Sequence, residues 1–193
     1  MSESYGSYPN CYSKVVDDLY ELDNGICPLC GKKVNKKNLE SINVDHIVPQ
    51  IVFKYANNSK LNRLCNGYSN LLLVHKACNL KKGIDLLDIN VLYLSKQRKQ
   101  DISSNIAKCK EYIDNFEDIR CKKIAEQESL CAICSTRLAT KDAILRRKDC
   151  KTERKLENCF AICKICNQKY SSYKHINSYE EINFKDFKEN FFS

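Results

Sequence analysis

A unit built around a closely spaced cysteine pair occurs twice in this chain of 193 residues, and the repeat constrains the fold more than any other feature. Cys27 and Cys30 begin the first copy, and Cys131 and Cys134 begin the second, with two residues between the cysteines each time. Each copy closes with an asparagine, a histidine or cysteine five residues later, and a Cys-Asn pair three residues after that. These closing residues are Asn70, His75, Cys78 and Asn79 in the first copy and Asn158, Cys163, Cys166 and Asn167 in the second. The repeat predicts two modules of one design.

The middle of the repeat also corresponds when residues are counted from the second cysteine of each pair. The pair Asp45-His46 lies fifteen residues after that cysteine in the first copy, and Asp149-Cys150 lies fifteen residues after it in the second. The first copy carries an insertion, residues 51–69, between its middle and closing parts. Counting therefore predicts that Cys150 takes the position of His46 in the second module.

The spacing of the cysteines favours zinc. The chain has thirteen cysteines and no secretory signal at its start, so we expect reduced thiols rather than disulfides. A structural zinc site has four tetrahedral ligands, usually delivered as two pairs, whereas the alternative is a set of unligated core cysteines. We predict two structural Zn2+ ions, one held by Cys27, Cys30, His75 and Cys78 and one by Cys131, Cys134, Cys163 and Cys166. The other cysteines lack such spacing and are predicted to be small apolar core residues: Cys11, Cys65, Cys109, Cys121, Cys150 and Cys159.

Residues 85–128 lie between the two copies and carry a helical pattern. Apolar residues recur at steps of three and four, with charges of both signs between them. They are Ile102, Ile106, Cys109, Ile113 and Phe116. This pattern predicts an amphipathic helix that packs as a connector and has no role with a cofactor or a membrane. The aromatic stretch 179–192 predicts a short helix that covers the second module, with base stacking as the alternative.

The residues around Asp45 and His46 predict a strand, because apolar residues recur at every second position along most of this segment. Pro49 ends the predicted strand. A second strand is expected over residues 70–75, and a short helix begins at Cys78. Here residues 26–84 resemble the HNH family, also called the ββα-metal nucleases, in the Asp-His pair, the middle asparagine and the Cys-Asn-x-x-Lys ending. The resemblance implies an α+β fold of tandem treble-clef-like ββα-metal zinc modules joined by a helical connector. We expect the divisions 1–84, 85–128 and 129–193.

The resemblance also implies roles for individual residues. His46 would act as general base, Asp45 and Asn79 would hold a catalytic Mg2+ or Mn2+, and Asn70 would orient His46 or brace the loop between the strands. Lys81 and Lys82 would contact phosphates. Each residue alone has a plain structural alternative as a helix cap or turn residue. The sequence departs from many family members in having His75 in place of a zinc-binding cysteine and Asn79 in place of a second histidine.

The second copy is predicted to be a degenerate module, because a cysteine is a poor general base for water. It contains a basic stretch that can lie along a phosphate backbone, although a solvated basic loop is the alternative. The predicted contacts are Arg146, Arg147, Lys148, Lys151, Arg154 and Lys155.

These observations predict an endonuclease that cuts double-stranded DNA, as a restriction, homing or phage-type enzyme. The net charge of +8 suits such a partner. One active site in each chain makes a homodimer plausible for double-strand cleavage. The alternative is a noncatalytic zinc protein that binds nucleic acid. We expect no small-molecule cofactor, no membrane segment and a cytoplasmic location, in a bacterium or encoded by a phage, virus or mobile element.

Overall fold

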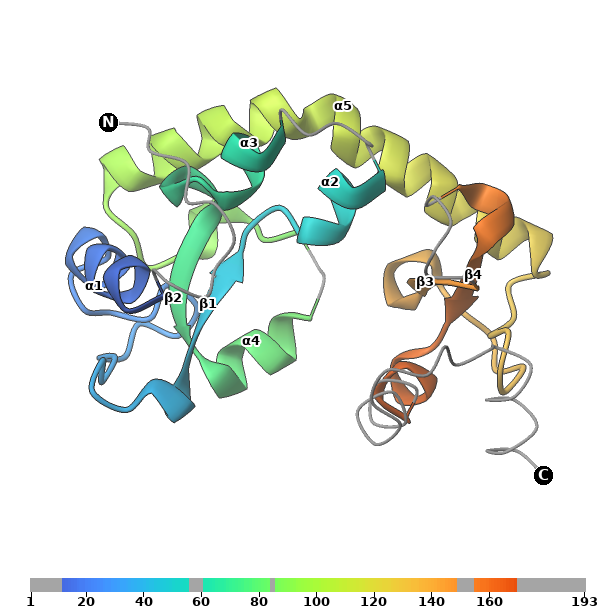
Figure 1. Ribbon diagram of the computed structural model, residues 1–193, viewed down its shortest axis with the longest axis horizontal. Coiled ribbons are helices and arrows are strands. Elements are labelled where there is room, and N and C mark those ends of the chain that lie inside the picture. Colours follow the sequence, from blue (N-terminus) through green and yellow to red (C-terminus); the bar gives the residue numbers. More distant parts are fainter. Residues whose placement is uncertain (1–11, 56–60, 84–85, 149–154, 170–193) are drawn as a thin grey trace. The chain divides into compact units, whose positions relative to one another are not determined.

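The computed structural model describes residues 12–55, 61–83, 86–148 and 155–169 (Figure 1). The chain divides into two compact units, residues 1–113 and 114–193. Both units combine helices with a two-stranded antiparallel sheet, so the predicted α+β class is confirmed. Several predicted features lie outside the described residues: Cys11, Asp149, Cys150, Lys151, Arg154 and the helix over 179–192.

The first unit has the predicted order of strand, strand and helix. Strand β1 (Ile42–His46) pairs with β2 (Leu71–His75), and α4 (Lys76–Lys82) follows β2 directly. A helix that the sequence did not predict, α1 (Tyr12–Leu22), precedes them. The insertion between the strands forms two short helices, α2 (Gln50–Tyr55) and α3 (Asn62–Asn66). Single 3-10 turns complete the unit: η2 (Leu39–Ser41), η4 (Tyr68–Asn70) and η5 (Ile89–Val91).

The core of the first unit lies around β2. Four consecutive residues of this strand, Leu71–Val74, are buried, so both of its faces are covered. Helix α1 packs against β2 and buries Val15, Val16 and Leu19. The apolar cluster also includes Ile42 of β1. A strand that is buried on both faces holds its edge partner β1 in a fixed register, which sets the position of the residues at the end of β1.

The amphipathic helix predicted within residues 85–128 is present as α5 (Lys96–Glu126), of 31 residues. Its apolar positions Ile102 and Cys109 are fully buried, and Phe116 is 3% exposed. No helix among the described residues is both long and apolar enough to cross a membrane. The division between the two units falls within α5, so the helix contributes residues to both.

The start of α5 is held to the first unit by a buried arginine. Arg98 Nε lies 3.1 Å from Asp23 Oδ1, and the side chains are 6% and 1% exposed. The two terminal nitrogens of Arg98 donate to the carbonyls of Tyr68 at 2.8 Å and Leu71 at 2.6 Å. Burial raises the pKa of Asp23, while the charge of Arg98 acts to lower it. Because these carbonyls belong to the segment that enters β2, Arg98 fixes the strand to the helix.

The second unit repeats the backbone of the first. An isolated bridge between Ile26 and Lys33 encloses the first knuckle (residues 26–33), and a bridge between Leu130 and Arg137 encloses the second (residues 130–137). Gly31 has a φ of 71°, and Ser135, at the same place in the second knuckle, has a φ of 58°. A serine in the left-handed region is uncommon, so the turn itself imposes this conformation.

The elements of the second unit follow the same order as those of the first. Strand β3 (Ile144–Arg147) pairs antiparallel with β4 (Cys159–Ile162), and residues 164–169 are helical. The 3-10 turns η6 (Thr140–Asp142) and η7 (Leu156–Asn158) precede the two strands. The last turns of α5 lead into the second knuckle as α1 leads into the first. The connector therefore also supplies the opening helix of the second copy.

Candidate metal centres and active site

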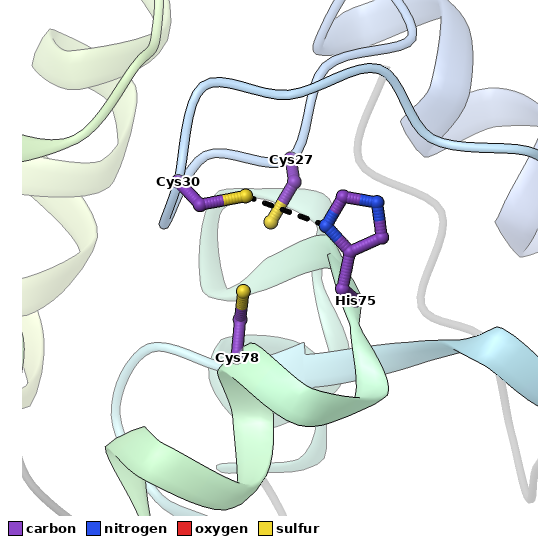
Figure 2. Close-up of side chains that lie close together, drawn as sticks. All are labelled: Cys27, Cys30, His75 and Cys78. Carbon is purple, nitrogen blue, oxygen red and sulfur yellow. Dashed lines mark hydrogen bonds between the residues drawn. The ribbon is translucent and has the colours of Figure 1, made fainter.

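Four side chains of the first unit converge at one point. Cys27 and Cys30 come from the first knuckle, His75 ends β2, and Cys78 lies in the first turn of α4 (Figure 2). Their ligand atoms all lie within 4.8 Å of one another, and Cys30 Sγ is 3.4 Å from His75 Nδ1. The structure therefore brings together the four residues that the sequence predicted as ligands, and they can hold a metal ion.

The protonation chemistry of this cluster suits a soft divalent cation. Burial acts to raise the pKa of Cys30, but hydrogen bonds from the Lys32 backbone and the His75 side chain outweigh it and lower the pKa to about 7. Burial and the neighbouring thiols raise the pKa of Cys78 to about 11. Neighbouring thiolates repel one another, and a bound cation removes that penalty. His75 Nε2 lies 3.1 Å from the Lys33 carbonyl, which holds the ring with Nδ1 toward the sulfur atoms (Figure 2).

The second unit assembles a cluster of thiols only. The sulfur atoms of Cys131, Cys134, Cys163 and Cys166 all lie within 4.8 Å of one another. Burial acts to raise the pKa of Cys134, yet hydrogen bonds from Thr136 lower it to about 6. Burial raises the pKa of Cys131 and of Cys166. As in the first cluster, one thiol with a lowered pKa lies beside thiols with raised pKa values. This set of four thiols also fits a thiophilic metal.

The cysteines outside the clusters separate into two groups. Cys65, Cys109 and Cys159 are buried, as predicted for apolar core residues. Burial raises the pKa of both Cys65 and Cys109 to about 11, so their thiols stay neutral. The prediction was wrong for Cys121, which is exposed on α5.

Asp45, near the end of β1, faces Lys82 of α4. Lys82 Nζ lies 2.9 Å from Asp45 Oδ2 and donates a 2.9 Å hydrogen bond to the His46 carbonyl. Asp45 Oδ1 accepts the His46 backbone N–H at 2.8 Å. Within the described part of the chain, Oδ2 is buried and accepts no well-directed hydrogen bond, so its contact with the ammonium is ionic only. A carboxylate oxygen with lone pairs to spare fits a hard divalent cation.

Asn79 and the two lysines of α4 differ in their surroundings. Asn79 is half-buried and stands three residues before Lys82, on the helix face that meets β1. Lys81 is exposed, so a phosphate contact from the surface remains a prediction for it. The Lys82 side chain is only 3% exposed, so any phosphate that it meets must lie at the site itself. Its ammonium forms a fixed positive charge beside Asp45.

His46 is held by two side chains that the sequence did not predict. Its Nε2 lies 3.2 Å from Asn66 Oδ1, at the end of α3, and 3.2 Å from Gln50 Nε2, at the start of α2. An amide oxygen only accepts and an amide nitrogen only donates, so the tautomer decides between the two contacts: a proton on Nε2 is donated to Asn66, whereas a lone pair on Nε2 accepts from Gln50. Burial lowers the pKa of His46 below its usual value of 6.5, the Asn66 bond and Asp45 act to raise it, and Lys82 and Lys54 act to lower it. The imidazole is therefore neutral at neutral pH.

Asn70 is fully buried and braces the loop after β1. Its side-chain oxygen accepts the Val48 backbone N–H at 2.8 Å, and its side-chain nitrogen donates to the carbonyls of Val48 at 3.1 Å and Cys65 at 2.8 Å. These contacts tie the segment after His46 to the end of α3. Of the two roles expected for Asn70, these contacts match the bracing role, since none of the three bonds reaches His46.

Replacing Asn70 with alanine is expected to destabilise the protein by about 3 kcal/mol, because three buried backbone groups lose their partners. Chemical denaturation, followed by circular dichroism, measures the change. Asn70→Asp keeps only the acceptor for the Val48 N–H and should fall between alanine and the wild type. Asn90→Ala, at an exposed position of η5, is the control. Equal stability of Asn70→Ala and the wild type would contradict the bracing role.

The register of the second sheet corrects the sequence correspondence. His46 lies opposite the first residue of β2, and Asp45 lies opposite the second. Arg147 and Arg146 lie opposite the first and second residues of β4. The prediction that Cys150 takes the position of His46 is therefore wrong, because Arg147 does. Arg146 lies twelve residues after its knuckle cysteine and Asp45 lies fifteen after its own, so the shorter loop shifts the count.

The comparisons with known proteins agree with this geometry. The family model of the HNH endonuclease matches residues 27–84. This segment is an HNH domain. It begins at the first cysteine of the knuckle and ends just after α4, so it contains both strands and the helix. The second unit lies outside the match, and its thiol cluster is compatible with a degenerate zinc module. No curated protein gives a significant match to the chain.

Two side chains that contact His46 in the HNH domain were not assigned to the site by sequence reasoning. Asn66 lies in the insertion and Gln50 directly precedes it, and no repeat or spacing there pointed to His46. Lys82 was predicted as a phosphate contact, but its buried place beside Asp45 follows only from the packing of α4 on β1. Among the predicted contacts of the second unit, Arg146 and Arg147 are half-buried, and Lys148 and Lys155 are exposed.

Proposed function

We propose that the protein is a metal-dependent endonuclease that hydrolyses phosphodiester bonds of double-stranded DNA. The observation that carries the proposal is the placement of His46 beside Asp45 at the end of β1, with α4 facing both, inside an HNH domain. A zinc-binding module that only binds nucleic acid has no need of a neutral histidine next to a carboxylate with a spare oxygen. We therefore prefer the enzyme to the noncatalytic alternative.

His46 is the proposed general base. The neutral imidazole removes a proton from the attacking water, and a lowered pKa keeps it neutral at physiological pH. In the tautomer that donates Nε2–H to Asn66, the lone pair that accepts the water proton is on Nδ1. Asn70 braces the loop that follows His46.

Asp45 and Asn79 are the proposed ligands of a catalytic Mg2+ or Mn2+. Both offer oxygen atoms, and the buried Asp45 Oδ2 has no directed hydrogen bond to give up. When bound, such a cation would supply neutralisation of the phosphate and of the departing 3′ oxygen. Lys82 adds a fixed positive charge at the same place, since its ammonium is 2.9 Å from Asp45. A second, structural role belongs to Zn2+ in each of the two Cys or Cys/His clusters.

The biological role is part of the proposal. We propose a restriction, homing or phage-type enzyme that works in the cytoplasm and that pairs as a homodimer when it cuts both strands. The HNH domain would be the catalytic part, α5 the connector, and the second module a contact to DNA.

Cleavage of supercoiled plasmid tests the proposed activity. The purified protein should convert the plasmid to nicked or linear forms when Mg2+ or Mn2+ is present, and should leave it intact without an added divalent cation. Gel electrophoresis separates the three forms. Binding without any cleavage, across divalent cations and varied DNA, would leave the noncatalytic alternative in place of the enzyme.

Asn66→Ala is expected to lower kcat by roughly 10-fold to 100-fold with little change in KM, because the histidine loses the partner that orients it. The Asn66 bond raises the pKa of His46, so its loss lowers that pKa further. The rate requires the neutral imidazole, so the acid limb of the pH profile should move to lower pH. Asn66→Asp keeps an acceptor oxygen and should recover part of kcat. An unchanged kcat and an unmoved acid limb would exclude this positioning role.

A further inference from the structure

The second unit carries an arginine where the HNH domain carries its metal-binding aspartate. Arg146 lies opposite the second residue of β4, as Asp45 lies opposite the second residue of β2. The helix that follows β4 presents Asn167 at the place of Asn79, directly after the last cysteine of the cluster. The position that faces the helix has thus changed from a carboxylate to a guanidinium.

The two side chains of this altered site are in contact. Arg146 Nε donates a hydrogen bond of 2.7 Å to Asn167 Oδ1. In the first unit, the corresponding asparagine oxygen is the proposed ligand of a divalent cation. In the second unit, the oxygen of the equivalent asparagine, Asn167, accepts a hydrogen bond from the guanidinium of Arg146. The cation that contacts this asparagine oxygen is therefore a side chain of the protein in the second site.

The local charge is positive along the end of β3. Arg147 and Lys148 follow Arg146, and Lys164 begins the helix that bears Asn167. The acidic residues on the adjoining 3-10 turns are Asp142 of η6 and Glu157 of η7. A guanidinium presents five N–H donors in a planar fork that matches the oxygens of a phosphate, and the bond from Nε to Asn167 sets the plane of that fork.

We propose that this former catalytic site is a metal-independent binding site for the DNA phosphodiester backbone, with Arg146 in the place of the metal ion and Asn167 as its positioning residue. The proposal rests on the proposed function for the choice of DNA as ligand. DNA binding by the second module would then depend on one particular side chain, Arg146, and not on a basic surface as a whole. The HNH domain requires a divalent cation to engage a phosphate, whereas the second module does not.

Equilibrium binding without an added divalent cation tests this site. A fluorescent DNA duplex is titrated with the full chain, carrying His46→Ala so that no cleavage can occur, and anisotropy gives Kd. Arg146→Ala should raise Kd by roughly 10-fold or more and reduce the slope of log Kd against log salt by about one. Lys141→Ala, an exposed lysine of η6 in the same unit, removes an equal charge and should change Kd by no more than about twofold.

Arg146→Asp provides a second, independent readout. It recreates the Asp/Asn pair of the HNH domain, so DNA binding at this site should be lost without divalent cations and partly regained when Mg2+ is added. Metal content and circular dichroism establish that each variant retains its fold. An Arg146→Ala variant that binds DNA as tightly as the Lys141→Ala control would overturn the proposal. That result would leave plasmid cleavage by the wild type untouched, whereas a wild type that binds DNA through Arg146 without cutting would overturn only the nuclease activity.

Discussion

Replacing His46 with alanine is expected to lower the rate of plasmid cleavage by about 100-fold to 10,000-fold, the range that a general base contributes. The imidazole is the proposed acceptor of the water proton, and burial holds its pKa below the usual 6.5 so that it is neutral when the enzyme works. Asp45, Lys82 and Asn79 remain in place in this variant. The affinity for DNA and for the divalent cation should therefore change little.

The assay is the conversion of supercoiled plasmid in Mg2+, followed over time for the variant and the wild type. Affinity for a DNA duplex, measured on the same preparations, separates a loss of chemistry from a loss of binding. Added imidazole fills the space left by the ring and should restore part of the rate to His46→Ala. A variant that cuts at the wild-type rate would remove His46 from the mechanism and would leave the cation as the source of the active hydroxide.

Replacing Cys78 with serine is expected to unfold the HNH domain. A structural zinc contributes about 10–16 kcal/mol in small modules, which exceeds the total stability of most domains. The cluster joins the first knuckle to the start of α4, so its loss also releases the helix that faces Asp45. We expect one metal ion per chain in place of two, loss of cooperative thermal unfolding in the first unit, and no plasmid cleavage.

Cys65→Ala is the matched control for this experiment. Cys65 is buried at 7% exposure in the same unit, but it belongs to neither cluster, and its pKa of about 11 marks a neutral thiol. Its replacement should cost about 1 kcal/mol and leave the metal content unchanged. Metal analysis and thermal unfolding give both quantities. If Cys78→Ser kept two metal ions and the stability of the Cys65→Ala control, the structural role of the first cluster would be wrong.

Both metal clusters could be predicted from the sequence because their chemistry is local. Two cysteines separated by two residues fit one turn, and a His or Cys three residues before a cysteine fits the junction of a strand and a helix. The structure brings both predicted sets within 4.8 Å. The amphipathic repeat of α5 and the order of strand, strand and helix were predicted for the same reason, since each pattern reports the period of its own element.

Counting residues along the sequence could not predict which residues of the two units occupy equivalent positions. Counting from the knuckle pairs His46 with Cys150, whereas the sheet register pairs it with Arg147. Residue number along a loop does not determine which residues are paired across a sheet, because loops of different lengths can connect the same elements. The hydrogen-bonded register is decided by which strand faces are buried, and burial is a property of the folded unit.

The sequence by itself determined the duplicated module, the eight residues of its two clusters and the candidates for catalysis. Only the tertiary structure decided that Asn66 binds His46, that Lys82 is buried against Asp45, and that Arg146 bonds to Asn167. Each of these contacts joins residues that are more than fifteen positions apart in the chain. Such pairs leave no periodic signal in the sequence, because they come together only when helices pack against strands around a common core.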